Sequence, residues 1–187
     1  MKNLLLIDCY DSFTDILAQT IENSGLCNVE ICPYDAISPK HFLFYDGFVL
    51  SPGPGLPYEY SQIFLALQRL KHKPVLGICM GHQIIGLASG ARLRHLGNVV
   101  HGQMTNLQFP VEDTIFSGIK HNEAVGLYHS WVLDKLPSQL LPIALSSDAK
   151  IMAIRHKVYP WIGLQFHPES YMTSGGKTII NNWLKNF

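Results

Sequence analysis

The stretch Pro74-Val75-Leu76-Gly77-Ile78-Cys79-Met80-Gly81-His82-Gln83 decides the fold. Its first half is an apolar run typical of a short buried strand, and its second half predicts a sharp turn followed by a helix. Cys79 lies at the turn, with Gly77 and Gly81 two residues away on either side. Backbones crowd together in such a turn, so the neighbours of a nucleophile there must lack side chains.

A helix that begins beside Cys79 would favour its thiolate, because a helix N-terminus attracts negative charge. The alternative is a cysteine that simply packs after a core strand, since free cysteines are often buried. The two flanking glycines and the following His82 and Gln83 favour the nucleophile.

Strand and helix patterns alternate before this stretch, as in a parallel α/β sheet. The continuous apolar run at residues 3–7 predicts a strand that is buried on both faces, and residues 29–31 and 47–50 are predicted to form the second and third strands. Ser12 followed by Asp15 matches a capping box and predicts a helix that stops at Gly25. Further helices are predicted at residues 62–70 and 83–88, the second closed by Gly90.

The pattern changes after residue 91. Turn signals at residues 101–102 and 117–118 punctuate short strand-like runs, and a last amphipathic helix is predicted at residues 178–184. We expect antiparallel strands that extend or flank the parallel core, at residues 93–95, 104–109, 125–129, 141–145, 151–156 and 161–166. The sequence contains no repeat, low-complexity tract or linker, so we expect residues 1–187 to form a single domain.

Composition narrows the function classes. The formal net charge of the 187 residues is zero, which gives no electrostatic argument for nucleic acid or an anionic membrane as a partner. No stretch approaches the ~20 apolar residues of a membrane span. The apolar run at the N-terminus is short and is followed by Asp8 and Asp11, so we interpret it as a core strand and not as a signal peptide.

The four cysteines, at positions 9, 27, 32 and 79, match neither a zinc site nor a secreted disulfide framework. This spacing indicates a reducing compartment, and we expect the protein to be cytoplasmic. Cys9, Cys27 and Cys32 lie in or beside strand-like runs and are interpreted as packing residues.

A second chemical cluster follows the last predicted strand, in the run Gln-Phe-His-Pro-Glu-Ser at residues 165–170. His167 is expected at the same edge of the sheet as Cys79. A thiol nucleophile needs an imidazole within hydrogen-bond reach, and the imidazole needs a carboxylate to fix its tautomer. Cys79, His167 and Glu169 supply these groups. A surface or core histidine is the alternative for His167, and a metal site is not expected because the zinc spacing is missing.

Acyl transfer also requires donors for a developing oxyanion. The backbone N–H of Met80, directly after the nucleophile, is the natural first donor. The loop of residues 51–55, Ser-Pro-Gly-Pro-Gly, follows a strand at the edge where ligands bind in such folds. Its Gly53 N–H is the predicted second donor, and a plain connecting loop is the alternative interpretation.

Taken together, these motifs resemble the class I (triad-type) glutamine amidotransferases. The resemblance is closest to the glutaminase subunits of anthranilate synthase and aminodeoxychorismate synthase. It is carried, in the family's order and over nearly the whole chain, by residues 6–14, 51–55, 77–83, 101–102, 128–130, 151–156 and 163–170.

The resemblance implies a flavodoxin-like open twisted sheet with a mostly parallel core, added antiparallel strands and helices on both faces. It implies that Cys79 attacks the carboxamide of L-glutamine, while His167 transfers protons and Glu169 orients the imidazole. It implies that Gly53, Pro54 and Gly55 line the oxyanion hole and glutamine site. It also implies that Gln83 and the backbone of Ser130 and Trp131 hold the amino-acid end of glutamine; a glutamine on a helix surface and a plain strand end are the alternatives. No cofactor or metal is expected in this subunit.

The sequence departs from the family's usual pattern at four places. Cys9 replaces an Asn, residues 15–16 are Asp-Ile in place of Tyr-Asn, residues 103–105 are Gln-Met-Thr in place of Lys-Thr-Ser, and Trp131 replaces a smaller apolar residue. None belongs to the triad, so the departures bear on the partner more than on glutamine hydrolysis.

The leading hypothesis is a glutaminase that passes ammonia to a separate, larger chorismate-binding synthase subunit (component I), because the chain has no room for an acceptor domain. The sequence leaves open whether the product is anthranilate or aminodeoxychorismate, with a slight preference for aminodeoxychorismate, and it leaves open the stoichiometry of the heteromer. A stand-alone cysteine amide hydrolase or peptidase and a non-catalytic docking module are the alternatives.

Overall fold

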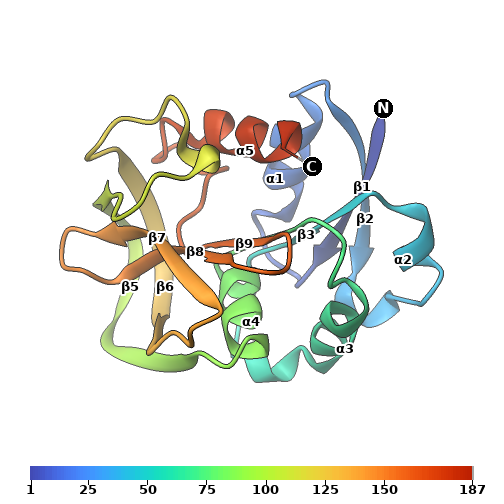
Figure 1. The fold of residues 1–187 in the computed structure, drawn as a ribbon, viewed down its shortest axis with the longest axis horizontal. Coiled ribbons are helices and arrows are strands. Elements are labelled where there is room, and N and C mark those ends of the chain that lie inside the picture. Colours follow the sequence, from blue (N-terminus) through green and yellow to red (C-terminus); the bar gives the residue numbers. More distant parts are fainter. Residues whose placement is uncertain (187) are drawn as a thin grey trace.

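Parallel strands form one half of a nine-stranded sheet in the computed structural model, which describes residues 1–186 (Figure 1). All neighbouring pairs in this half are parallel. In spatial order the strands are β2 (Cys27–Pro33), β1 (Lys2–Asp8), β3 (Gly47–Leu50), β4 (Val75–Ile78) and β9 (Trp161–Leu164).

Antiparallel strands continue the same sheet from the other side of β9. The order after β9 is β8 (Ile151–His156), β7 (Leu140–Ser146), β5 (Arg92–Gln108) and β6 (Ala124–Asp134). β5 and β6 pair along most of their length and form a long hairpin at one end of the molecule (Figure 1). The predicted fold class, a mostly parallel core with added antiparallel strands and helices on both faces, is confirmed.

Helices cover both faces of the sheet (Figure 1). α1 (Thr14–Glu22) and α5 (Gly176–Lys185) lie on one face, and α3 (Ser61–Arg69) and α4 (Met80–Ala88) lie on the other. The sequence did not predict the short helix α2 (His41–Phe44) or the 3₁₀ turns η1 (Tyr34–Ala36), η2 (Pro57–Glu59) and η3 (Thr114–Phe116). No helix among the described residues is long and apolar enough to cross a membrane.

The central strands are apolar on both faces because each face carries its own core. Successive side chains of β1 point to opposite sides. Leu4 and Leu6 pack in the cluster that includes α1 and α5, whereas Leu5 and Ile7 pack in the cluster that includes α3 and α4. This arrangement explains the apolar runs of β1 and β3, whereas β2 is the edge strand and Glu30 and Ile31 in it are exposed; the strands predicted at residues 3–7, 29–31 and 47–50 all form.

The predicted capping box at Ser12 is wrong. Phe13 occupies the N-cap position of α1 and makes no side-chain cap. The carboxylates of the preceding loop serve instead, since Asp11 Oδ1 accepts from the Phe13 N–H at 2.8 Å and Asp8 Oδ1 accepts from the Thr14 hydroxyl at 2.6 Å. Carboxylates suit a helix N-terminus for the same electrostatic reason as the predicted cap.

Two predictions for the second half of the sheet also need correction. The runs at residues 93–95 and 104–109 belong mostly to one long strand, β5, and the turn predicted at residues 101–102 is a bulge inside it. Gly102 has φ +64° there, and the register with β6 shifts. The run at 161–166 is not wholly antiparallel, because β9 pairs in parallel with β4 and antiparallel only with β8.

Candidate active site

Cys79 lies on a strained turn between β4 and α4. Its backbone has φ 49° and ψ −95°, a conformation that residues other than glycine rarely adopt. A Cβ on Gly77 would lie 2.4 Å from the Gly81 carbonyl carbon, and a Cβ on Gly81 would lie 2.5 Å from the Leu50 carbonyl oxygen. The turn therefore requires both glycines, as the sequence predicts, and α4 begins at Met80 and not at the predicted Gln83.

Neighbouring strands bring His167 to the same edge of the sheet as Cys79. Ile78 at the end of β4 is in register with Leu164 at the end of β9, and the Cys79 N–H donates to the Leu164 carbonyl at 2.7 Å. The chain after β9 then leads directly to His167 and Glu169. A separation of 88 positions in sequence is thus bridged by one pair of adjacent parallel strands.

His167 and Glu169 form a buried pair. His167 Nδ1 lies 2.6 Å from Glu169 Oε1, and the two side chains are 2% and 0% exposed. The rings of Phe13 and Tyr128 lie against the imidazole, at centroid distances of 5.2 and 4.9 Å. The imidazole is therefore fixed on one edge by a carboxylate and covered by aromatic rings.

The electrostatic setting of His167 favours its protonated form. Burial alone would lower the pKa of His167, but the Cys79 sulfur and the Glu169 carboxylate outweigh burial and raise it to about 10. The second ring nitrogen, Nε2, is buried without a hydrogen-bond partner among the described residues. The arrangement therefore couples a thiol to an imidazole whose outer nitrogen remains available for proton transfer.

The other three cysteines have a different character. Burial is the main cause that raises the pKa of Cys9, to about 12, and it also raises the pKa of Cys27 and Cys32. All three remain thiols at neutral pH and are weak nucleophiles, because the thiolate is the reactive form.

The loop after β3 packs closely against the first strand. Ser51 is fully buried and its hydroxyl accepts from the Cys9 N–H at 2.8 Å. A Cβ on Gly53 would lie 2.6 Å from the Cys9 Cβ, and the Tyr60 hydroxyl donates to the Pro54 carbonyl at 2.7 Å. Gly55 has φ +73°. The predicted loop is therefore held rigidly beside the turn that carries Cys79, since Leu50 at its start contacts the beginning of α4.

Gln83 and Trp131, predicted to bind the amino-acid end of the substrate, lie together. Gln83 Nε2 donates to the Trp131 carbonyl at 2.9 Å, which joins α4 to β6 next to Ser130. Gln83 and Met80 are 4% exposed, whereas Ser130 and Trp131 are half-buried. The Trp131 ring packs edge-on against His95 of β5, with the ring centroids 4.8 Å apart.

Sequence reasoning missed three residues of this site. Phe13 and Tyr128 cover the imidazole, and Gln165 lies with its Nε2 3.7 Å from the Cys79 sulfur. Tyr128 and Gln165 stand inside motifs that were singled out, so their position was the available signal. Phe13 also stands inside one of them, residues 6–14, but its contact with His167 depends on how the loop after β1 folds across the sheet edge.

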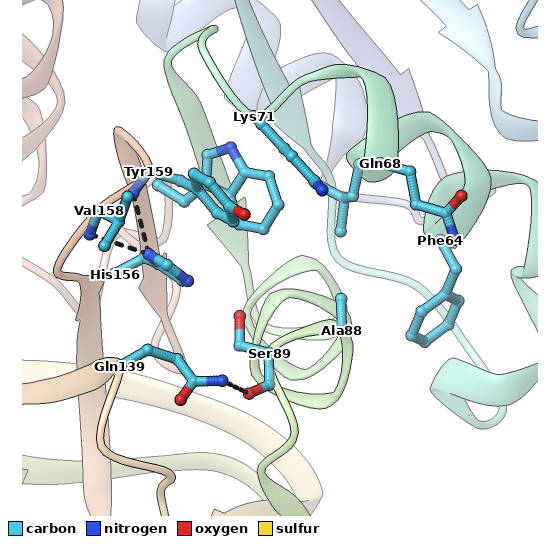
Figure 2. A pocket seen from close by; sticks show the side chains of 11 residues that line it. Phe64, Gln68, Lys71, Ala88, Ser89, Gln139, His156, Val158 and Tyr159 are labelled. Carbon is cyan, nitrogen blue, oxygen red and sulfur yellow. Dashed lines mark hydrogen bonds between the residues drawn. The ribbon is translucent and has the colours of Figure 1, made fainter.

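A cavity of about 480 Å³ lies elsewhere, between α3, the C-terminal end of α4 and the start of β9 (Figure 2). Its walls include Phe64, Lys71, Ser89, His156 and Tyr159, and Gln139 reaches into it to donate to the Ser89 carbonyl at 2.7 Å. None of the predicted site residues lines this cavity, which is at the opposite end of α4 from Cys79. Among residues 1–186, no group of three histidine, cysteine or acidic side chains is placed to hold a metal ion.

A mixed α/β sheet that presents a cysteine on a strand–helix turn, beside a buried histidine and glutamate, is the arrangement expected of an enzyme with a thiol nucleophile. Residues 5–187 match the family described as glutamine amidotransferase class I. The chain belongs to this family, and the resemblance noted in its sequence is confirmed. It is therefore a glutamine amidotransferase.

Relatives and solved structures agree with this assignment. The chain is 39% identical to anthranilate synthase component 2 of Saccharolobus solfataricus, over 98% of both chains. It is 37% identical to the bifunctional protein TrpGD of Thermotoga maritima, of which it spans 32%, about a third of that protein's length. A crystal structure of a Thermoplasma acidophilum protein, described as a candidate GMP synthase subunit, superposes with a TM-score of 0.90 at 26% identity, over 99% of this chain and 93% of that one.

Proposed function

We propose that this protein hydrolyses L-glutamine through Cys79, His167 and Glu169. We further propose that it delivers the ammonia to a separate component I subunit, which uses it to convert chorismate into anthranilate. The observation that carries the proposal is the buried His167–Glu169 pair beside the strained Cys79 turn. The named component 2 relative, which matches this chain end to end, supports the choice of partner.

The chemistry follows from the groups at the sheet edge. The Cys79 thiolate attacks the carboxamide carbon of glutamine and forms a C–S bond, and the N–H groups of Met80 and Gly53 stabilise the resulting oxyanion. His167 protonates the departing nitrogen, so the C–N bond breaks and ammonia leaves. His167 then removes a proton from water, which attacks the thioester and releases glutamate and the free thiolate. Glu169 holds the imidazole and stabilises its charged form.

Substrate recognition is assigned to the groups around this centre. Gln83 uses its Nε2 for contacts within the protein, so its Oε1 is the atom left to accept from the α-ammonium group of glutamine. The backbone of Ser130 and Trp131 holds the same end of the substrate. The loop of residues 53–55 supports the carboxamide end, since its backbone is fixed beside the Cys79 turn.

The names of the relatives change the preference between the two chorismate products. The sequence alone slightly favours an aminodeoxychorismate synthase partner, whereas the relative that the chain matches over its whole length is named for anthranilate synthase. We therefore assign the protein to the anthranilate branch. A stand-alone hydrolase, which needs no partner for full turnover, is the alternative that the test must exclude.

Reconstitution tests the proposal. The purified chain is mixed with chorismate and component I from the same organism, and anthranilate is measured with either glutamine or ammonium as the nitrogen donor. We expect anthranilate from glutamine only when both subunits are present. The Cys79→Ser variant is expected to abolish the glutamine-dependent reaction and to leave the ammonium-dependent reaction intact, because only the first requires the thiol.

Each alternative has its own outcome. Product formed only with the aminodeoxychorismate synthase subunit would move the protein to that branch. Full glutamine turnover without any partner would favour the stand-alone hydrolase. Absence of Cys79 labelling by 6-diazo-5-oxo-norleucine, a glutamine-like electrophile, would favour the non-catalytic module, and glutaminase activity retained by Cys79→Ser would exclude the thiol mechanism.

A further inference from the structure

Gln165 is held immediately beside the nucleophile by the backbone. It is the first residue after β9, as Cys79 is the first after β4, and these two strands are parallel neighbours. The Gln165 N–H donates to the Met152 carbonyl of β8 at 2.8 Å, and the residue is fully buried. Its side chain therefore has a fixed origin at the edge of the sheet where the thiol lies.

The hydrogen bonds around Gln165 determine which end of its amide faces the sulfur. The Trp131 carbonyl can only accept, so the Gln83 atom that lies 2.9 Å from it must be the NH₂ group, Nε2. The same nitrogen lies 3.2 Å from the Gln165 amide, whose facing atom must then be the oxygen, Oε1. Gln165 therefore directs its NH₂ group at the Cys79 sulfur, 3.7 Å away.

The direction of these hydrogen bonds has a chemical consequence. An N–H group that points at sulfur stabilises the thiolate more than the thiol, since hydrogen bonds to ionised acceptors are the stronger ones. A glutamine amide does not ionise near neutral pH, so its donor remains in place while His167 gains and loses a proton. The site is buried, and this strengthens the effect of a single oriented donor.

We propose that Gln165 is a positioning residue that stabilises the Cys79 thiolate and connects it, through Gln83, to the Trp131 carbonyl at the substrate-binding end of the site. This inference rests on the proposed thiol mechanism and adds a second source of thiolate stabilisation to it. Gln83 then acts at two places. Its Oε1 faces the substrate, and its Nε2 holds the Gln165 amide in the orientation that points the Gln165 NH₂ group at the Cys79 sulfur.

A purely structural role for Gln165 makes a different prediction. A buried amide with satisfied hydrogen bonds contributes to folding whether or not it touches the sulfur. Its loss would then lower the melting temperature without changing how Cys79 responds to pH. The pH dependence of Cys79 reactivity therefore separates the two roles.

Two substitutions test the proposal. Gln165→Met keeps the approximate length of the side chain and removes the donor, and Gln165→Glu keeps the shape and leaves only acceptors. The rate of Cys79 alkylation by iodoacetamide is measured against pH, with the modified peptide identified by mass spectrometry. We expect the midpoint of the rate profile to rise by about one pH unit in Gln165→Met, which makes alkylation about tenfold slower below the midpoint. Gln165→Glu is expected to raise it further, because its carboxylate repels the thiolate.

A matched control comes from the other end of α4. The Gln139 amide donates to the Ser89 carbonyl in the cavity of Figure 2, far along the helix from the thiol. Gln139→Met removes the same kind of group, and the alkylation profile is expected to match that of the unaltered protein.

Glutamine kinetics in the reconstituted complex provide a second measurement. Gln165→Met should lower kcat about tenfold with KM within about twofold, whereas loss of substrate contacts in Gln83→Met should also raise KM.

The outcomes distinguish this inference from the proposed function. If the unaltered protein is alkylated at Cys79 and hydrolyses glutamine, while both folded Gln165 variants keep its midpoint, the inference is wrong and the triad stands. If Cys79 of the unaltered protein reacts with neither iodoacetamide nor 6-diazo-5-oxo-norleucine, the proposed function itself fails. Two variants are used so that one remains measurable if the other unfolds.

Discussion

At the scale of single residues, Cys79 is one of the described residues other than glycine whose backbone has a positive φ. A left-handed conformation at a residue other than glycine costs about 1–3 kcal/mol. The structure restrains it from both sides, because the Cys79 N–H donates to the Leu164 carbonyl at 2.7 Å and the Gln83 N–H donates to the Cys79 carbonyl at 3.1 Å. The strained turn thus belongs both to the sheet and to α4, and the thiol has little freedom to move away from His167.

The role of Glu169 gives a prediction at this scale. In Glu169→Gln the amide no longer stabilises the charged imidazole, and its NH₂ group can face Nδ1 and impose the wrong tautomer. The pKa of His167 should fall, and kcat for glutamine hydrolysis should decrease by roughly 10²–10⁴-fold. The measurement is the pH profile of kcat in the complex with component I. Glu112→Gln, an exposed substitution, serves as the control, and an unchanged kcat in Glu169→Gln would remove Glu169 from the mechanism.

The sequence predicted the placement of Cys79, His167 and Glu169 at one edge of the sheet better than it predicted their surroundings. Cys79, His167 and Glu169 follow predicted strands, and the parallel order places such positions at one edge. The orientation of the Gln165 amide and the ring of Phe13 against His167 depend on contacts between elements far apart in the chain. No local pattern encodes such contacts, so these features required the structure.

At the scale of secondary-structure elements, the turn between β4 and α4 depends on close backbone contacts. Gly77 lies against the Gly81 carbonyl group, and Gly81 lies against Leu50 of β3. The helix can therefore start directly above the sheet, which places the Met80 N–H next to the thiol. Side chains at these glycines would push α4 away from β3 and β4.

Gly77→Ala should therefore destabilise the protein and inactivate it. The added Cβ would meet the Gly81 backbone at 2.4 Å, and backbone atoms cannot rotate away as a flexible side chain can. We expect a loss of about 3 kcal/mol in the free energy of unfolding, measured by urea denaturation, together with loss of glutaminase activity. Gly97→Ala is the control, because its Cβ meets nothing within 4 Å and its φ of +83° alone costs about 1–2 kcal/mol. Equal losses in the two variants would refute the steric argument.

The parallel elements were easier to predict than the antiparallel ones for a physical reason. A strand buried on both faces must be apolar throughout, so β3 and β4 are visible as short apolar runs. β5 is largely exposed and bulged at Gly102, so its pattern breaks into pieces that look like separate strands. The neighbours of β9 depend on the whole topology, and local sequence did not reveal that one of them is parallel.

At the scale of the whole molecule, two buried histidines lie on elements that are far apart in the chain, α4 and β6. His82 on α4 packs against Gly163 of β9, and His129 lies on β6. Burial is the main cause that lowers the pKa of His82 to about 3 and that of His129 to about 4. Both side chains are therefore neutral in the folded protein well below the pH at which a free histidine becomes charged.

These histidines make stability depend on pH. Their folded pKa values lie below the ordinary value of 6.5, so the unfolded chain binds more protons than the folded one between about pH 4 and 6.5. The contribution of these two histidines to stability is complete above pH 6.5 and falls as the pH decreases, by about 2 kcal/mol for each histidine at pH 5. The raised pKa of His167 acts in the opposite direction, because its contribution is lost as the pH rises above 6.5. Urea denaturation between pH 4.5 and 7.5 measures this slope.

A variant identifies the source of the slope. His82 and His129 together cause a decrease in the free energy of unfolding as the pH falls below 6.5. His129→Asn should reduce this decrease by about half, whatever the effect of the substitution on stability at pH 7.5. Asn98→Gln, an exposed substitution that neither adds nor removes an ionisable group, should leave the slope unchanged. The same slope in His129→Asn and in the unaltered protein would mean that other groups cause the acid sensitivity.

The position of β9 between β4 and β8 also determines when the candidate site is assembled during synthesis. Residues 1–78 supply β1 to β4 and expose one open edge of the sheet, and the strand that fills this edge is made only after β5 to β8. Pairing of such distant segments is a slow, late step in folding. A nascent chain therefore carries Cys79 without His167 beside it, and the two side chains come together only when β9 has been inserted.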